Sequence, residues 1–243
     1  MRKVIHSFYL FLSIFLIYCT TYKIPFKAEG FSGGFGGPQN ETEEKTPKII
    51  NKNPVIFVHG IYSSAGFFIP ARDWFLSNGY NVYEIFAIEF SDNSTPILYN
   101  AALELKKFVQ KVIEYTQKDK VVLIGHSRGV PIIRIYKRFL GGIKNISHIV
   151  YIAGPNHGTP LANINSPLYP EHNFIRSLNT PTETLPDIKY LCIRAESDRY
   201  YPGKFKNSPF LNGAKNIMIP QTNHLDVAIN KNTFKEILDF INN

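Results

Sequence analysis

VVLIGHSRGV, residues 121–130, joins a strand pattern to a helix pattern through a turn with two glycines. Four apolar, strand-favouring residues come first, then GHSRG at 125–129, then a helix pattern with Pro131 in its tolerated first turn. A strand, a tight turn and a helix in this order form the context of a nucleophile elbow. The glycines leave room for a serine held in a strained backbone conformation at the tip. We predict that Ser127 stands at such a tip.

Six short apolar runs alternate with helical patterns from residue 53 onward, which is the arrangement of a parallel sheet with crossover helices. A proline-rich, irregular segment at 155–187 interrupts the alternation, and long segments of this kind are usually functional loops. We predict an α/β fold with about six mostly parallel strands flanked by helices, in one domain at 53–243. The runs are PVIFV, NVYEIFAI, VVLI, HIVYIA, YLCIR and NIMIP. Between the second and third runs, apolar residues that recur with the period of a helix predict an amphipathic helix; they are Leu98, Ala101, Leu105, Phe108, Val109, Val112 and Ile113.

Residues 1–19 have the pattern of an export signal. Arg2 and Lys3 precede the apolar run VIHSFYLFLSIFLIY, which has no acidic residue and is shorter than the roughly 20 residues of a spanning helix. Cys19 ends the run, where bacterial lipoproteins carry their lipidated cysteine, although Tyr18 is larger than the small residue that usually precedes it. Lipidation at Cys19 and plain cleavage nearby therefore stay open. We expect an exported protein, secreted or lipid-anchored at the cell envelope.

Residues 20–52 are rich in glycine and polar side chains and show no sustained period, which predicts a flexible tether. The formal net charge is +8, and loss of Arg2 and Lys3 with the signal leaves 8 − 2 = +6. A positive surface favours anionic membranes, so membrane-surface association is one expectation, although scattered lysines on a solvated face explain the charge as well. We expect a monomer.

Cys192 lies in the apolar run YLCI and has no partner once Cys19 is removed or acylated. A buried, unreactive thiol is therefore expected rather than a disulfide. Nothing in the chain resembles a zinc-ligand spacing or a nucleic-acid module. We expect no metal, no organic cofactor and no nucleic-acid partner.

A nucleophilic serine needs a base, and in this type of fold the acid and then the histidine follow the serine. Position sets four of the seven histidines aside: His6 lies in the signal, His59 and His126 precede or flank the serine, and His148 begins a strand. The remaining candidates for the base are His157, His172 and His224. His224 is favoured because it lies in PQTNHLDV, between the last strand and the final helix TFKEILDFI. His157, in GPNHGTP after the strand HIVYIA, is the rival. The favoured acid is Asp198, after the strand YLCIR, with Asp187 and Glu196 in reserve.

The turn also predicts an oxyanion hole. The N–H of Arg128 follows the nucleophile at the start of a helix, where free N–H groups favour a developing negative charge. A second N–H is expected at Ile61, after PVIFVHG, where Gly60 lets the chain turn and His59 is structural.

At these residues the chain resembles a known family, the class 2 lipases, which are compact bacterial triacylglycerol lipases and esterases of the α/β-hydrolase fold. The matching stretches from about residue 53 onward are NPVIFVHGI, GHSRGV, RSLNTPTET, SDRYYP, LNGAKNI and TNH. The resemblance implies hydrolysis of lipid or other carboxylic esters through an acyl-enzyme, with Ser127 as nucleophile, Asp198 as acid, His224 as base, and Ile61 and Arg128 as oxyanion donors. One departure is Arg128 itself, since methionine or glutamine often follows the nucleophile in lipases; its side chain would meet an anionic substrate group or point to solvent.

Candidates for the acyl-binding wall are Phe67, Phe68, Ile69, Leu168 and Tyr169, and core packing explains Phe67, Phe68 and Ile69 equally well. Three other functions stay open. A depolymerase of hydroxyalkanoate polyesters and an acyltransferase would use the same triad. A non-catalytic binding protein on the same fold would have no need of serine, acid and histidine at three strand ends.

Overall fold

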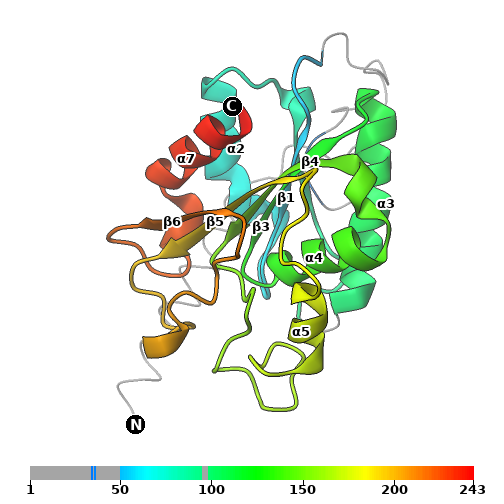
Figure 1. Cartoon of the computed structure of the whole chain (residues 1–243). Coiled ribbons are helices and arrows are strands. Elements are labelled where there is room, and N and C mark those ends of the chain that lie inside the picture. The colour runs from blue at the N-terminus through cyan, green and yellow to red at the C-terminus, as the bar shows by residue number, and fades with distance from the viewer. Residues whose placement is uncertain (1–33, 35, 37–49, 95–97) are drawn as a thin grey trace.

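Six parallel strands form one sheet in the computed structural model, which describes residues 34, 36, 50–94 and 98–243 (Figure 1). All six predicted runs form strands, so the predicted α/β fold is confirmed, and the sheet is parallel throughout. The order is β2-β1-β3-β4-β5-β6. The strands are β1 (Val55–Val58), β2 (Ile85–Ile88), β3 (Val121–His126), β4 (Ile146–Ile152), β5 (Lys189–Ala195) and β6 (Lys215–Ile219).

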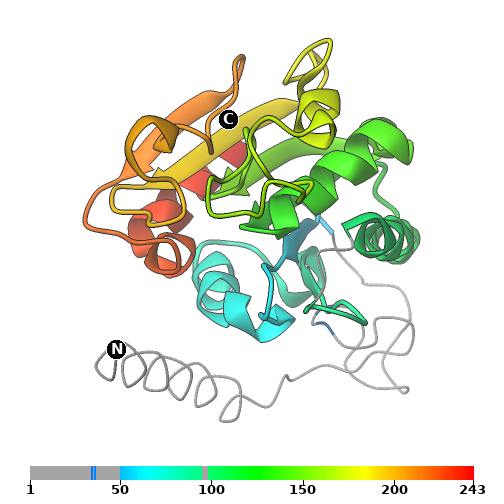
Figure 2. The ribbon, with the colours of Figure 1, turned by 90° about the horizontal axis from the view of Figure 1, so that it is seen from below.

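Helices cover both faces of the sheet, with α3, α4 and α5 on one side and α2 and α7 on the other (Figures 1 and 2). The helices are α2 (Ile69–Ser77), α3 (Leu98–Thr116), α4 (Gly129–Phe139), α5 (Asn173–Asn179), α6 (Asp226–Ile229) and α7 (Lys231–Ile241), and the short 3-10 turns are η1 (Ala65–Phe68), η2 (Val82–Glu84), η3 (Gly142–Asn145) and η4 (Gly203–Phe205). This layered arrangement buries both faces of the strands, as a parallel sheet requires.

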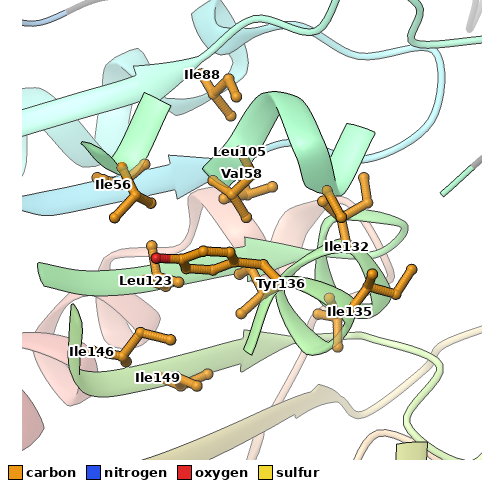
Figure 3. Packing of buried hydrophobic residues seen from close by; sticks show 14 of the residues in the cluster. Ile56, Val58, Ile88, Leu105, Leu123, Ile132, Ile135, Tyr136, Ile146 and Ile149 are labelled. Atoms are coloured by element: carbon orange, nitrogen blue, oxygen red, sulfur yellow. The ribbon is translucent and has the colours of Figure 1, made fainter. Parts of the chain in front are cut away.

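The hydrophobic core lies in two clusters, one on each face of the sheet. On the α3 and α4 side, Leu105 of α3 and Tyr136 of α4 pack on Leu123 of β3 (Figure 3). Helix α4 is buried along most of its length, from Gly129 to Lys137, because it is covered by the sheet, α3 and α5. This burial explains why the helix that begins at the predicted elbow is held rigidly.

The carboxyl ends of parallel strands share one edge of the sheet, and the loops that follow β4 and β5 lie at that edge, below the sheet in Figure 1. The helices that follow the adjacent strands β1 and β3, α2 and α4, lie on opposite faces. Such a switch of faces opens a crevice outside the strand ends, where open α/β sheets bind their ligands. The topology therefore places a site between the loops after β1 and β3.

The structure describes Gly34 and Gly36 within the predicted tether, and both lie against β2. A Cβ at Gly34 would be 1.9 Å from the Ala87 carbonyl oxygen, so only glycine permits this close approach. The predicted export signal, including Cys19, lies outside the described residues, and export stays a prediction. Within the described part of the chain, every helix is too short or too polar to cross a membrane.

Candidate active site

The turn after β3 is an elbow with a strained residue at its tip. Ser127 has a φ of +53°, in the left-handed region that non-glycine residues rarely adopt. A Cβ at Gly125 would lie 2.7 Å from the Ile133 side chain, and a Cβ at Gly129 would lie 2.2 Å from the Val58 carbonyl oxygen. The two glycines are therefore needed for the close approach of the elbow to α4 and β1, as the pattern predicted.

Three side chains from separate loops meet at the elbow. His224, in the loop after β6, has its Nε2 2.9 Å from Ser127 Oγ. Its Nδ1 lies 2.7 Å from Oδ2 of Asp198, in the loop after β5. A carboxylate oxygen accepts hydrogen bonds, so Nδ1 carries the hydrogen and donates it to Asp198, and the Nε2 lone pair faces the serine hydroxyl. This is the tautomer that a general base for Ser127 needs.

The surroundings of Asp198 keep its carboxylate in place. The other oxygen, Oδ1, accepts the N–H of Tyr200 at 2.9 Å, and the Tyr200 ring lies 4.4 Å from the His224 ring. The side chains of Asp198 and His224 are nearly fully buried, which limits competition from water. The acid therefore orients the imidazole from a rigid position.

The other predicted candidates lie elsewhere. His157 pairs with Glu183 at 2.8 Å, and Nδ1 of His172 accepts the N–H of Phe174 as the N-cap of α5. Asp187 is exposed just before β5, at the opposite edge of the sheet. Glu196 is also exposed, and its Oε2 accepts the N–H of Gln221. The structure thus brings His224 and Asp198 to Ser127 and leaves the alternatives outside the site.

The loop after β1 presses against the elbow at Gly60. A Cβ at this position would lie 3.1 Å from the Ser127 Cβ, so the next residue, Ile61, lies beside the nucleophile. Within the described residues, the turn hydrogen bonds here use the N–H groups of Tyr62, Ser127 and Val130, and not those of Ile61 or Arg128. The two predicted oxyanion donors are therefore available to a bound group.

The Arg128 side chain does not point to solvent. The residue is 4% exposed, and its three guanidinium nitrogens have no hydrogen-bond partner among the described residues. The guanidinium carbon lies 5.8 Å from the centre of the Phe90 ring. Burial lowers the pKa of Arg128, and the nearby charges of Asp92 and Glu104 oppose that shift. Of the two predicted orientations, the solvent-facing one is wrong.

The predicted acyl-wall residues separate into two groups. Phe68 is 1% exposed and stacks on Phe57 inside the core. Ile69 is 4% exposed. The assignment of Phe68 and Ile69 to the acyl wall is therefore corrected, because core packing accounts for both. Phe67 is half-buried and stacks on His126, beside the nucleophile. Leu168 and Tyr169 are partly exposed in the loop after β4. These three remain candidates for contact with an acyl chain.

Two further predictions concern ligands and thiols. Cys192 is a buried free thiol, and burial raises its pKa to about 12, as expected for an unreactive cysteine. Among the described residues, no group of three or more histidine, cysteine, aspartate or glutamate side chains could hold a metal ion.

His126, which sequence reasoning set aside because it only flanks the nucleophile, is part of the site. Its Nε2 lies 2.8 Å from the His224 carbonyl oxygen, and its ring lies 4.9 Å from the His224 ring. Burial, with a smaller effect of His224, lowers the pKa of His126 to about 3. Its direct proximity to the nucleophile in the sequence was the one available signal.

This pKa predicts that the protein loses stability in acid. The folded pKa of about 3 lies below the ordinary 6.5, so between these values the unfolded chain binds a proton that the folded chain excludes. The contribution of neutral His126 to the free energy of unfolding is fully present above pH 6.5. It is lost as the pH falls toward 3, at about 1.4 kcal/mol per pH unit. We expect the free energy of unfolding, measured with urea at several pH values from 7 to 4, to fall less steeply with decreasing pH in His126→Gln than in the wild type. Equal slopes would contradict the low pKa.

Residues 52–173 match the model of the family described as Lipase (class 2). The mature form of a Bacillus licheniformis lipase matches with a TM-score of 0.66 and 16% identity, over 86% of this chain and 97% of that chain. Aspergillus fumigatus lipase B matches with a TM-score of 0.67 and 15% identity, over 91% of this chain and 61% of that chain. A Bacillus subtilis carboxylesterase matches with a TM-score of 0.51 and 15% identity, over 80% of this chain and 85% of that chain. At such identities the structural likeness shows a shared fold.

Proposed function

The chain belongs to the class 2 lipase family, and we propose that it is a serine hydrolase that cleaves carboxylic esters of lipids. The observation that carries the proposal is the pair of hydrogen bonds that joins the three side chains. Asp198 Oδ2 lies 2.7 Å from His224 Nδ1, and His224 Nε2 lies 2.9 Å from Ser127 Oγ. The family match and the likeness to solved lipases and a carboxylesterase support an ester hydrolase.

The proposed reaction is acyl transfer to water in two steps. In the first, His224 Nε2 takes the hydroxyl proton as Ser127 Oγ bonds to the ester carbonyl carbon, and the N–H groups of Ile61 and Arg128 stabilise the oxyanion. The intermediate collapses, the carbon–oxygen bond to the alcohol breaks, and the alcohol leaves with the proton from His224. In the second step a water attacks the acyl-enzyme with His224 as base, which releases the acid and restores Ser127.

The apolar rim of the site supports a lipid substrate. Ile61 and Tyr62, in the loop after β1, are 41% and 68% exposed, and Leu161, in the loop after β4, is 60% exposed. The backbone of Leu161 is linked to the triad in three steps. Its N–H donates to Thr159 Oγ1, and the Thr159 hydroxyl donates to the carbonyl of Tyr200. The Tyr200 ring lies 4.4 Å from the His224 ring. Exposed apolar side chains in the loops after β1 and β4, which both lie at the carboxyl edge of the sheet, favour an acyl chain over a polar substrate.

The full-length chain should hydrolyse emulsified triacylglycerols and p-nitrophenyl esters, with a higher kcat/KM for medium and long acyl chains than for acetate. A fluorophosphonate probe should label the chain once, at Ser127, because such probes need a serine activated by a base. Absence of turnover on every ester, together with absence of labelling at Ser127, would overturn the proposed function. An optimum at acetate would keep the ester hydrolase and exclude the lipase.

A further inference from the structure

We propose that His126 is a positioning residue that holds the base, His224, against the nucleophile through its backbone. The inference rests on the proposed function and deepens it. His126 is the last residue of β3 and directly precedes Ser127, and its Nε2 lies 2.8 Å from the carbonyl oxygen of His224, 98 residues away in the sequence. The carbonyl only accepts hydrogen bonds, so Nε2 is the nitrogen that carries the hydrogen.

Two consecutive residues of the elbow thus form hydrogen bonds with the base, His224. Ser127 meets the imidazole of His224, and His126 meets the carbonyl of the same residue. The distance between Ser127 Oγ and His224 Nε2 then depends on two contacts: the hydrogen bond between these atoms, and the hydrogen bond from His126, which fixes the His224 backbone relative to the end of β3. Because a misplacement of about 1 Å in a catalytic group can cost about 100-fold in rate, a second anchor of this kind matters for turnover.

Two other hydrogen bonds hold the loop after β6, which carries the base, to the end of β6 and to the loop after β5. Thr222 Oγ1 donates to the carbonyl of Ile219, and the Thr222 carbonyl accepts the N–H of Ser197. Among the described residues, the His126 contact is the hydrogen bond that ties the backbone of His224 to β3, the strand of the nucleophile.

The His126 ring is itself fixed on several sides. It stacks on Phe67 with 5.3 Å between ring centres and an interplanar angle of 26°, and the His224 ring lies on another side at 4.9 Å. Gly60, in the loop after β1, lies next to Nδ1, since a Cβ there would be in van der Waals contact with that atom, at 3.5 Å. The ring therefore connects the loops after β1 and β6 to the end of β3.

An uncharged donor suits this position. The low pKa of His126, caused mainly by burial, keeps the ring neutral at the pH where esterases act. A positive charge 4.9 Å from the His224 ring would disfavour the imidazolium that forms there during catalysis. A buried neutral imidazole supplies the N–H without that penalty.

Two variants separate the hydrogen bond from the packing. His126→Phe keeps a flat ring against Phe67 and removes the donor, whereas His126→Gln places an amide N–H near the position of Nε2. We expect His126→Phe to lower kcat by about 10- to 100-fold with KM changed less than about twofold, and His126→Gln to recover most of the loss. His148→Phe, which removes a half-buried histidine of the neighbouring strand β4, is the matched control and should keep the wild-type kcat.

A spectroscopic reading makes the test independent of turnover. The Nδ1–H of His224, hydrogen-bonded to Asp198, should give a downfield proton signal in NMR. We expect this signal in the wild type and in His126→Gln, and its broadening or loss in His126→Phe. If His126→Phe does not fold, His126→Leu takes its place in both measurements.

The results distinguish the two proposals. Wild-type kcat in folded His126→Phe would show that the ring only packs. A loss in His126→Gln as large as in His126→Phe would show that the N–H donor does not account for the effect. Either result would overturn the positioning role. If the wild type neither hydrolyses esters nor reacts with the fluorophosphonate, the proposed function fails. The NMR signal would then still support the positioning geometry if Gln restores it and refute that geometry if it does not.

Discussion

Replacement of Ser127 by alanine should lower kcat for ester hydrolysis by about 10⁴- to 10⁶-fold. The reason is that no acyl-enzyme can form without Oγ, which is the atom that His224 Nε2 faces at 2.9 Å. The residual rate reflects the oxyanion donors and substrate binding alone. The measurement is release of p-nitrophenol by the full-length wild type and variant, with fluorophosphonate labelling lost in parallel.

Ser63→Ala is the control for this substitution. Ser63 is another buried serine near the site, in the loop after β1, and its hydroxyl has no hydrogen-bond partner among the described residues. Its removal should leave kcat within about twofold of the wild type. A Ser127→Ala variant that retained a tenth or more of the wild-type activity would mean that another residue is the nucleophile.

Asp198→Asn should lower kcat by about 10⁴-fold while the fold is retained. The asparagine amide has nearly the shape of the carboxylate, so the N–H of Tyr200 can still be accepted at the position of Oδ1. It no longer stabilises the imidazolium, and when its NH₂ faces Nδ1 it selects the tautomer with the hydrogen on Nε2. His224 then loses the lone pair that faces Ser127.

Glu196→Gln is the matched control, because it neutralises a carboxylate two residues away on the same loop. Glu196 is exposed, and its Oε2 accepts the N–H of Gln221. We expect kcat within about twofold of the wild type for this variant. A loss of less than tenfold in Asp198→Asn, or a comparable loss in Glu196→Gln, would remove Asp198 from its proposed role.

The strands, the elbow and the long helices could be predicted because their determinants are local. Apolar runs such as VVLI bury both faces of a parallel strand, and the 3.6-residue period of α3 places its apolar side on the sheet. The glycines around Ser127 were equally readable, because a tight turn from strand to helix leaves no room for side chains at these two positions. For the same reason a G-x-S-x-G motif in this context predicted the strained backbone of Ser127, whose φ is +53°.

The choice among histidines and carboxylates depended on tertiary contacts. The positions of His157 and His224 after strands made both acceptable bases, and the pairing of His157 with Glu183 is what separates them. Phe68 was assigned to the acyl wall because an aromatic residue after β1 suits either a cleft or a core. Its stacking on Phe57 depends on how η1 folds back over the sheet.

Local sequence thus specified the parallel sheet and the elbow that presents Ser127, because backbone conformation and strand burial depend on neighbouring residues. The sequence favoured Asp198 and His224, and only the tertiary structure brings their side chains to Ser127. Tertiary structure alone also placed Arg128 in the interior and His126 against the His224 carbonyl. These contacts join residues as far as 98 positions apart. They exist only where separate loops meet at the carboxyl edge of the sheet, where the packing of the whole domain sets distances and burial.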